Sequence, residues 1–272
     1  MYLVGELINC TRKRVARAVV SGDKAAIQQI AINQVEAGAS CLDVNGGIPG
    51  LEKHYLPWLV DVIQEVTDIP LCLDSADPEA LAAALPNCRR SPLINSITLD
   101  PTRMGALIPL ARAYNTGVIA LCLDESGYPT SAEDRVTIGV RLVEHLTDAG
   151  ISADRIYVDP AIFPVSTNTS AGIAALDAIG AIVRACPGVH AVCGLSNVSF
   201  GLPQRLLLNQ VFLVLAMGRG LDAVIADPCD RQLMADLIAA ETLLNRDEDC
   251  LGYLEAHQNN RLGSPVEAGR LS

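Results

Sequence analysis

Short apolar runs alternate with amphipathic stretches along the chain, in units of roughly 30 residues. Apolar runs typical of buried strands occupy 3–9, 40–45, 69–75, 92–97, 118–124, 155–159, 191–197 and 223–227. Stretches with helical periodicity follow them at 24–36, 55–66, from 77 onward, and at 103–114, 132–148, 172–185, 203–217 and 231–245. We therefore expect eight strands, each followed by a helix.

Eight such units in one chain predict an α/β fold in which a closed parallel sheet is surrounded by helices, the (β/α)8 or TIM barrel. An open doubly wound sheet is the alternative, and it usually carries a glycine-rich dinucleotide turn after its first strand. Here that turn reads CTRKR at 10–14, which favours the barrel. We expect residues 1–272 to form a single domain, with the polar segment 252–272 as a surface tail.

The amino-acid composition restricts the kind of core and the kinds of partner that we expect. Hydrophobic residues make up 50% of the chain and aromatic residues only 4%, so the core must be aliphatic, as parallel sheets prefer. The formal net charge of −11 disfavours nucleic acid and anionic membranes as partners. The most apolar helix, 206–217, is interrupted by Asn209 and Gln210, and we interpret it as a packed core helix rather than a membrane span.

The cysteines indicate a reducing compartment. Their number, 9, is odd, no two form a CxxC pair, and several lie inside apolar runs. We interpret them as buried free thiols and expect no zinc or iron–sulfur site in this chain. The chain opens on a strand-like run rather than a secretory signal, and we expect a cytoplasmic location.

The ends of the predicted strands carry the candidate chemistry, because a TIM barrel builds its active site there. No lysine ends a strand, which argues against a Schiff-base aldolase, and no histidine does, which disfavours a histidine-based metal site. Carboxylates, amides and hydroxyls dominate instead, at Glu6, Asn9, Asp43, Asn45, Asp74, Ser75, Asn95, Ser96, Asp124, Asp159, Ser196, Asn197, Ser199 and Asp227.

Such a rim suits a flat heterocycle with several N–H groups on one edge. A carboxylate accepts hydrogen bonds and an amide both donates and accepts, as the amino-pyrimidinone edge of a pterin requires. A phosphate would instead need basic residues or a glycine-lined helix start. Structural roles stay open for some positions: Asp77 before Pro78 is best interpreted as a helix cap, Asp227 as a turn or site residue, and Glu6 as a buried or ligand-binding carboxylate.

Six segments together resemble the methyltetrahydrofolate:corrinoid protein methyltransferases. These enzymes belong to the pterin-binding barrels, which also include dihydropteroate synthase. The resemblance covers about 2–245 and rests on VGELIN at 4–9, CLDVN at 41–45, LCLDS at 71–75, LINS at 93–96, IYVDP at 156–160 and GLSNVS at 194–199.

The resemblance assigns roles residue by residue. Asp74, Asn95 and Asp159 match the positions that bind the pterin edge. Asn197 matches the amide that hydrogen-bonds N5 of the folate, and we expect it to stabilise a proton at N5 in the transition state. An Asn197→Ala variant should therefore lose rate far more than folate affinity.

Further positions line the implied pocket or depart from the family pattern. Asp43, Gly194 and Ser196 match pocket-lining positions. Phe200 stands where well-known members have a glutamine, so the contacts around the transferred methyl group or along the corrinoid-facing rim are expected to differ.

The implied activity is a methyl transfer between N5 of tetrahydrofolate and the cobalt of a corrinoid (cobalamin) carried by a partner protein, with tetrahydrofolate or methyltetrahydrofolate as substrate. The chain has no Asp-x-His-x-x-Gly run of its own for binding a corrinoid. The resemblance also implies a homodimer through barrel helices, which the apolar helix 206–217 supports. Neither the direction of transfer nor the corrinoid partner follows from the sequence.

Three alternatives remain. A non-catalytic protein could bind reduced folate without transferring methyl. A dihydropteroate synthase-like enzyme would need basic residues near its last strands to hold pyrophosphate, and the segments 194–200 and 225–230 carry none. A barrel lyase should show a lysine base or a metal set at the strand ends.

Overall fold

Eight parallel strands form a single sheet in the computed structural model, which describes residues 1–48 and 50–262. Their order is β7-β6-β5-β4-β3-β2-β1-β8. A parallel bridge between Gly194, just after β7, and Ile225 in β8 brings the two ends of the sheet together, and the TIM barrel prediction is confirmed. The strands are β1 (Tyr2–Asn9), β2 (Cys41–Asn45), β3 (Leu71–Asp74), β4 (Leu93–Leu99), β5 (Gly117–Asp124), β6 (Ile156–Asp159), β7 (His190–Ala191) and β8 (Ala223–Ala226).

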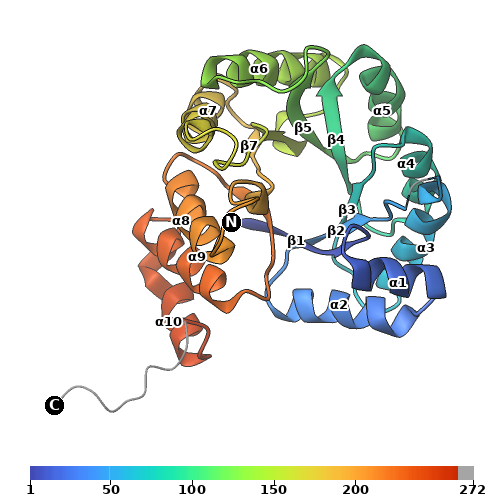
Figure 1. Ribbon diagram of the computed structural model, residues 1–272, viewed down its shortest axis with the longest axis horizontal. Coiled ribbons are helices and arrows are strands. Elements are labelled where there is room, and N and C mark those ends of the chain that lie inside the picture. The colour runs from blue at the N-terminus through green and yellow to red at the C-terminus, as the bar shows by residue number, and fades with distance from the viewer. Residues whose placement is uncertain (49, 263–272) are drawn as a thin grey trace.

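The predicted helices surround the strands in an outer ring (Figure 1). Asp77 caps the third of them by accepting a hydrogen bond from the Glu79 backbone N–H at 2.9 Å, as its place before Pro78 predicts. The helices of the ring are α2 (Lys24–Glu36), α3 (Glu52–Gln64), α4 (Pro78–Ala84), α5 (Pro101–Ala113), α6 (Ala132–Asp148), α7 (Ala171–Ala185), α8 (Arg205–Met217) and α9 (Arg231–Leu243).

Two helices were not expected from the sequence. α1 (Lys13–Ser21) lies between β1 and α2, and it buries Val15, Ala18 and Val19 at helical spacing although its start reads as a basic turn. α10 (Leu251–Gln258) occupies part of the segment 252–272 that the sequence predicted as a tail, and it packs against α9 with Ala256 buried. The rest of that segment, 263–272, lies outside the described residues.

The seventh strand is shorter than the sequence predicts. A strand was expected over 191–197, but β7 ends at Ala191, and the chain forms a 3-10 turn over Leu195–Asn197. The Asn197 N–H donates to the Gly194 carbonyl at 3.3 Å within this turn. Ser196 and Asn197 are therefore carried by a turn at the barrel mouth and not by a strand.

The inside of the barrel is divided along its axis. One buried apolar cluster contains Val4, Cys41, Cys72, Leu93, Ile119, Val192 and Ala223, with Tyr157 packed against it, and we call these the lower positions. Side chains two residues apart on a strand point to the same side. The upper positions follow two residues later on each strand: Glu6, Asp43, Asp74, Asn95, Leu121, Asp159, Gly194 and Ile225.

Helix α8 is only partly the packed core helix that the sequence predicts. Phe212, Leu213, Ala216 and Met217 are buried on one side. The opposite side leaves apolar residues more than half exposed, namely Leu206, Leu207, Val211 and Leu215. Over the described ranges, no helix is long and apolar enough to cross a membrane.

Candidate functional site

The upper positions and the loops above them line one cavity of about 440 Å³ at the mouth of the barrel. The cavity size is typical of small-molecule sites. All seven site residues expected from the sequence lie in its wall, and their individual roles stay predictions. They are Asp43, Asp74, Asn95, Asp159, Gly194, Ser196 and Asn197, accompanied by Glu6, Asn9, Thr11, Arg12, Ser96, Leu121 and Ile225.

Two asparagine amides orient two carboxylates in this cavity. Asn95 Nδ2 donates to Asp43 Oδ1 at 3.2 Å. Asn45 Nδ2 donates to Asp74 Oδ2 at 2.8 Å, while its own oxygen accepts from the Gly47 N–H. Because β2, β3 and β4 are neighbours in the sheet, Asn45, Asp74 and Asn95 form a row of amide, carboxylate and amide, with Asp43 two residues earlier on β2. Such a row can both accept from and donate to the edge of a flat ring.

Burial raises the pKa of these carboxyl groups. Asp43 is 3% exposed, and desolvation, with the charge of nearby Asp74 added, raises its pKa well above the usual range. Desolvation also raises the pKa of Asp74, although the hydrogen bond from Asn45 opposes it. The wall therefore favours partners that supply N–H donors to the buried oxygens.

Asp159 is a further buried carboxyl whose pKa is raised toward neutral. It is 7% exposed, and its Oδ1 accepts a hydrogen bond from the Ala161 N–H at 2.8 Å. Desolvation raises the pKa of Asp159 to about 6, against the lowering effect of the Ala161 and Gly194 N–H groups. This carboxyl can therefore take up or release a proton at physiological pH.

The turn at 194–197 places a primary amide beside these carboxyls. A Cβ atom added to Gly194 would lie 3.0 Å from Asn197 Nδ2, so a glycine is needed for the amide to sit where it does. The neighbouring Ser196 Oγ donates to Glu6 Oε2 at 3.3 Å across the mouth.

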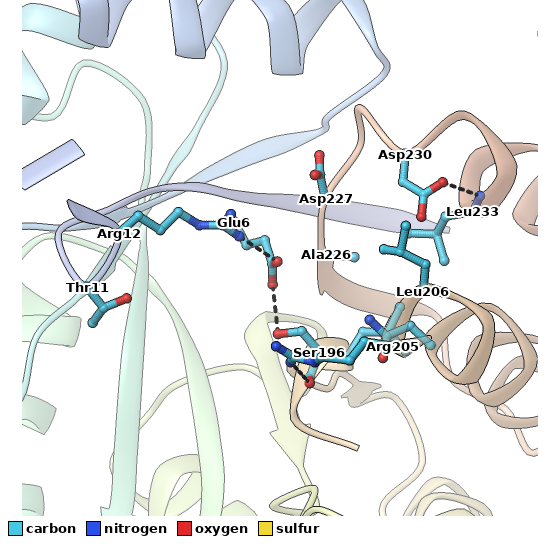
Figure 2. Close-up of a pocket in the computed structure, with 12 residues that line it drawn as sticks. Glu6, Thr11, Arg12, Ser196, Arg205, Leu206, Ala226, Asp227, Asp230 and Leu233 are labelled. Atoms are coloured by element: carbon cyan, nitrogen blue, oxygen red, sulfur yellow. Dashed lines mark hydrogen bonds and ion pairs between the residues drawn. The ribbon is translucent and has the colours of Figure 1, made fainter. Parts of the chain in front are cut away.

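A second cavity of about 440 Å³ continues from the first toward α8 and β8. Figure 2 shows Glu6 and Ser196 pointing toward each other across it, with Arg12 paired to Glu6 at 3.0 Å. Desolvation raises the pKa of Glu6, and Arg12 opposes that shift. We call this side the charged shoulder, and its ionisable residues are Glu6, Arg12, Arg205, Asp227 and Asp230.

The two arginines of the charged shoulder were missed from the sequence. Arg12 follows β1 in a turn that was considered only for its lack of glycines. Arg205 is the first residue of α8, and its guanidinium donates to the Ser196 carbonyl at 2.6 Å and to Ser199 Oγ at 3.1 Å. The sequence signal that could have found these arginines is a basic residue directly after a strand end or at the start of the next helix.

Other polar strand ends have structural roles. The Asp124 carboxylate accepts a hydrogen bond from the Ser126 N–H at 2.9 Å and closes a turn. Asp227 accepts from the Cys229 N–H at 2.8 Å, so it closes a turn and also lines the charged shoulder. Glu6 likewise combines the two roles left open for it, since it is hydrogen-bonded and part of both cavity walls.

No cysteine lines either of these cavities, although Cys72 neighbours the Asp43 carboxyl. All nine are free thiols, and six of them are buried. Across residues 1–48 and 50–262, no three histidine, cysteine, aspartate or glutamate side chains are grouped so that they could hold a metal ion.

Comparison with curated proteins gives a relative that matches along its entire length. The chain is 35% identical over 271 residues to a methylcorrinoid:tetrahydrofolate methyltransferase from Eubacterium limosum, covering 98% of this chain and 100% of that protein. It is 29% identical over 244 residues to a methionine synthase from Mycobacterium leprae, covering 83% of this chain. The chain spans 20% of the length of that longer protein.

Comparison with solved structures supports the same fold. A dihydropteroate synthase from Xanthomonas albilineans superposes with a TM-score of 0.69 at 20% identity, covering 90% of this chain and 93% of that one. The enzyme from Thermus thermophilus gives a TM-score of 0.67 at 19% identity, with the same coverage. The family model described as "Pterin binding enzyme" matches residues 5–227. With that match and the full-length relative, the chain belongs to the pterin-binding enzyme family.

Proposed function

We propose that the protein is a methyltransferase that moves a methyl group between N5 of tetrahydrofolate and the cobalt of a corrinoid carried by a separate protein. The observation that carries this proposal is the convergence of Asp74, Asn95, Asp159 and Asn197 from four distant segments on one open cavity. The relative from Eubacterium limosum, matched over its whole length, adds the reaction class.

The pterin would bind with its N–H edge against the row of amides and carboxylates. Asp74 and Asp159 accept from ring N–H groups, and Asn95 supplies a donor and an acceptor side by side. Burial makes each of these hydrogen bonds worth more than it would be in water. The site therefore holds the ring in one orientation and fixes N5 for in-line transfer.

The reaction requires proton movement at N5. In transfer to folate, the N5 lone pair forms a bond to the methyl carbon, the cobalt–carbon bond breaks with its electron pair left on cobalt as Co(I), and N5 loses a proton. In the reverse direction Co(I) attacks the methyl carbon, and N5 regains the proton as it leaves.

Asn197 and Asp159 are placed to support that proton movement. The Asn197 amide oxygen accepts from N5–H and stabilises positive charge there in the transition state. Asp159, with a pKa raised to about 6, is the nearby group that can exchange the proton. The relative's name gives the methylcorrinoid as donor and tetrahydrofolate as acceptor, and we propose the same direction here.

The partner and the assembly are part of the same proposal. The cavity opens at the barrel mouth, where a corrinoid protein would dock and present its methyl group. The exposed apolar side of α8 would form the contact of a homodimer, because such a face gains free energy when a second copy covers it. Nine free thiols suit a reducing cytoplasm.

The test is to mix the protein with tetrahydrofolate and methylcobalamin, which stands in for the methylated corrinoid protein, under anaerobic conditions. We expect methyl–cobalt absorbance to fall, Co(I) absorbance to rise, and methyltetrahydrofolate to appear in equal amount. If the protein binds folate in a titration but causes no spectral change, either with methylcobalamin or with methylated corrinoid proteins, it is a folate-binding protein and not a methyltransferase. No folate uptake at all would end the proposal.

A further inference from the structure

One arginine, Arg103, extends from the outer ring of helices to the loops at the ends of β3 and β4. It lies in the first turn of α5, where Asp100 caps the helix by accepting from the Arg103 backbone N–H at 2.7 Å. Arg103 lines neither of the two cavities described at the barrel mouth. Any effect of its side chain on a bound ligand must therefore pass through the residues that it contacts.

The Arg103 side chain donates to three backbone carbonyl groups. Its Nε donates to the Ser96 carbonyl at 2.7 Å. Its two terminal nitrogens donate to the Ala76 carbonyl at 2.7 Å and to the Ser75 carbonyl at 3.0 Å. The N–H groups of a guanidinium have fixed directions in one plane, so the three bonds together hold the two chain segments in one relative position.

Two of these carbonyls belong to residues that directly follow proposed pterin ligands. Ser75 follows Asp74 at the end of β3. Ser96 follows Asn95 within β4. Asp74 and Asn95 are neighbours in the parallel ladder, and the Ser75 N–H donates to the Asn95 carbonyl at 3.3 Å. One guanidinium therefore fixes the backbone immediately after both ligands.

Arg103 also supplies a positive charge close to the Asp74 carboxyl. Desolvation raises the pKa of Asp74, and the hydrogen bond from Asn45 and the charge of Arg103 oppose this shift. The other charged groups near Asp74 are negative, namely Asp43 on β2 and Glu52 at the start of α3. Without the arginine, the carboxyl would be surrounded by negative charge and would hold its proton to higher pH.

The charge on Arg103 is itself maintained in this half-buried position. Burial lowers the pKa of Arg103, but Asp74 and the capping residue Asp100 oppose that shift, and a guanidinium stays protonated in proteins. An ionised carboxyl accepts hydrogen bonds at both oxygens, whereas a protonated one turns one oxygen into a donor. The arginine therefore favours the form of Asp74 that the N–H edge of a pterin requires.

We propose that Arg103 is a positioning residue for the pterin edge, because it fixes the segments that carry Asp74 and Asn95 and stabilises the Asp74 carboxylate. This inference rests on the proposed function. Because Arg103 acts through two pterin ligands, it controls folate affinity and the dependence of that affinity on pH. The rate of methyl transfer at saturating folate depends on it much less.

The experiment is an anaerobic calorimetric titration with tetrahydrofolate between about pH 5.5 and about pH 8. Arg103→Met removes both the charge and the hydrogen bonds. Arg103→Lys keeps the charge, but an ammonium group on a flexible stem cannot reproduce the planar set of three bonds. Arg112→Met is the matched control, because Arg112 is an exposed arginine on the same helix. Urea unfolding of each variant measures its stability separately.

The two variants should differ in how their affinity depends on pH. Arg103→Met should weaken tetrahydrofolate binding about tenfold at about pH 8 and more at about pH 6, since Asp74 then takes up its proton at higher pH. Arg103→Lys should weaken binding about fivefold by the same factor at every pH. Added to Asp74→Asn, which cannot ionise, Arg103→Met should lose the pH-dependent part of its effect. Arg112→Met should match wild type.

Three results would overturn the inference. The first is unchanged tetrahydrofolate affinity in Arg103→Met. The second is a loss that is equal in Arg103→Met and Arg103→Lys and equal at every pH, because the arginine would then only support the fold. The third is unchanged folate affinity with a raised half-saturating concentration of methylcobalamin, which would assign Arg103 to the corrinoid.

The design also separates this inference from the proposed function. If Arg103→Met does not fold, Arg103→Lys decides the question, and wild-type affinity in that variant would overturn the inference. If the wild-type protein binds tetrahydrofolate but transfers no methyl group, the methyltransferase proposal fails while the role of Arg103 is still tested by the titrations. If the wild-type protein does not bind tetrahydrofolate, both proposals fail.

Discussion

The lower and upper positions of the barrel point the same way and lie two residues apart, but five of the eight upper positions carry a polar side chain where the lower cluster is apolar. The seven residues of the lower cluster are apolar and no more than 6% exposed. Two residues further along each strand, about 7 Å up the barrel, the side chains include Glu6, Asp43, Asp74, Asn95 and Asp159. The comparison teaches that one stretch of strand supplies stability at its start and chemistry at its end.

The buried carboxyl groups at the upper positions reduce the stability of the fold, as their raised pKa values indicate. Burial raises the pKa of Asp43, Asp74 and Asp159, which means that the folded protein disfavours their charged forms. A position selected only for stability would carry an aliphatic residue there. Two kinds of substitution test this contrast: those that exchange a polar and an apolar residue between upper and lower positions, and those that change one site residue at a time.

The largest effect is expected from a carboxylate at a lower position. Ile119→Asp should lower the free energy of unfolding by about 4 kcal/mol or more, because it buries a charge with no hydrogen-bonding partner. The opposite exchange, Asp43→Leu, should change it by less than about 1 kcal/mol while weakening folate binding about tenfold. Urea unfolding and folate titration measure the two quantities. Equal destabilisation by both substitutions would remove the contrast.

Asn197→Ala should give the largest loss of activity without a loss of fold. Single-turnover methyl transfer should slow by about 100-fold or more, since help with proton movement is typically worth that much. Folate affinity should change by less than about threefold. The matched control is Asn33→Ala, an exposed asparagine on α2 in the outer ring. Near-normal single-turnover transfer in Asn197→Ala would disprove the N5 role.

Asp159 gives a prediction on pH. The pKa of Asp159 is raised to about 6 in the folded state, so the folded protein binds its proton more tightly than the unfolded chain does. The carboxyl therefore costs stability progressively as pH rises from about 4 to about 6, up to about 3 kcal/mol. Asp159→Asn should gain stability relative to wild type over that window, as measured by urea unfolding without folate. A difference that stays constant with pH would contradict the shift.

The smallest effect is expected at Gly194. Its added Cβ would meet the Asn197 amide at 3.0 Å, so Gly194→Ala should displace that amide by a few tenths of an ångström. We expect the methyl-transfer rate to fall about tenfold, with stability within about 1 kcal/mol of wild type. Gly105→Ala is the control, because a Cβ there meets nothing within 4 Å. Equal rates in both variants would show that the turn adapts freely.

Much of the fold could be predicted because its signals are local. Apolar runs and helical periodicity repeat eight times, and strand ends such as Asp43 and Asp74 are recognised by the polar residue that closes each run. The family resemblance then assigned the roles of these residues, which no spacing could have provided. That assignment placed all seven residues in what proved to be one cavity.

The features that were missed depend on contacts between distant segments. The early end of β7 could not be predicted from the sequence, because the run 191–193 is as apolar as any strand, and the end is set by pairing with β6 at His190 and Ala191 alone. Arg205 reaches the mouth from a helix start, and Phe200 lies beside Tyr128 and Phe163 only after three loops fold together. Exposure of one side of α8 likewise depends on which face the neighbouring helices cover.

The short seam between β7 and β8 has a consequence for the reaction cycle. A catalytic amide set in the middle of a long strand could not change its tilt without disturbing a ladder of backbone bonds on both sides. Asn197 instead lies on a compact loop that follows a two-residue strand, and one parallel bridge, Gly194 to Ile225, joins this loop to β8. In the proposed reaction, this position would let the amide follow N5 as that atom gains or loses its methyl substituent, while the strands of the barrel keep their places.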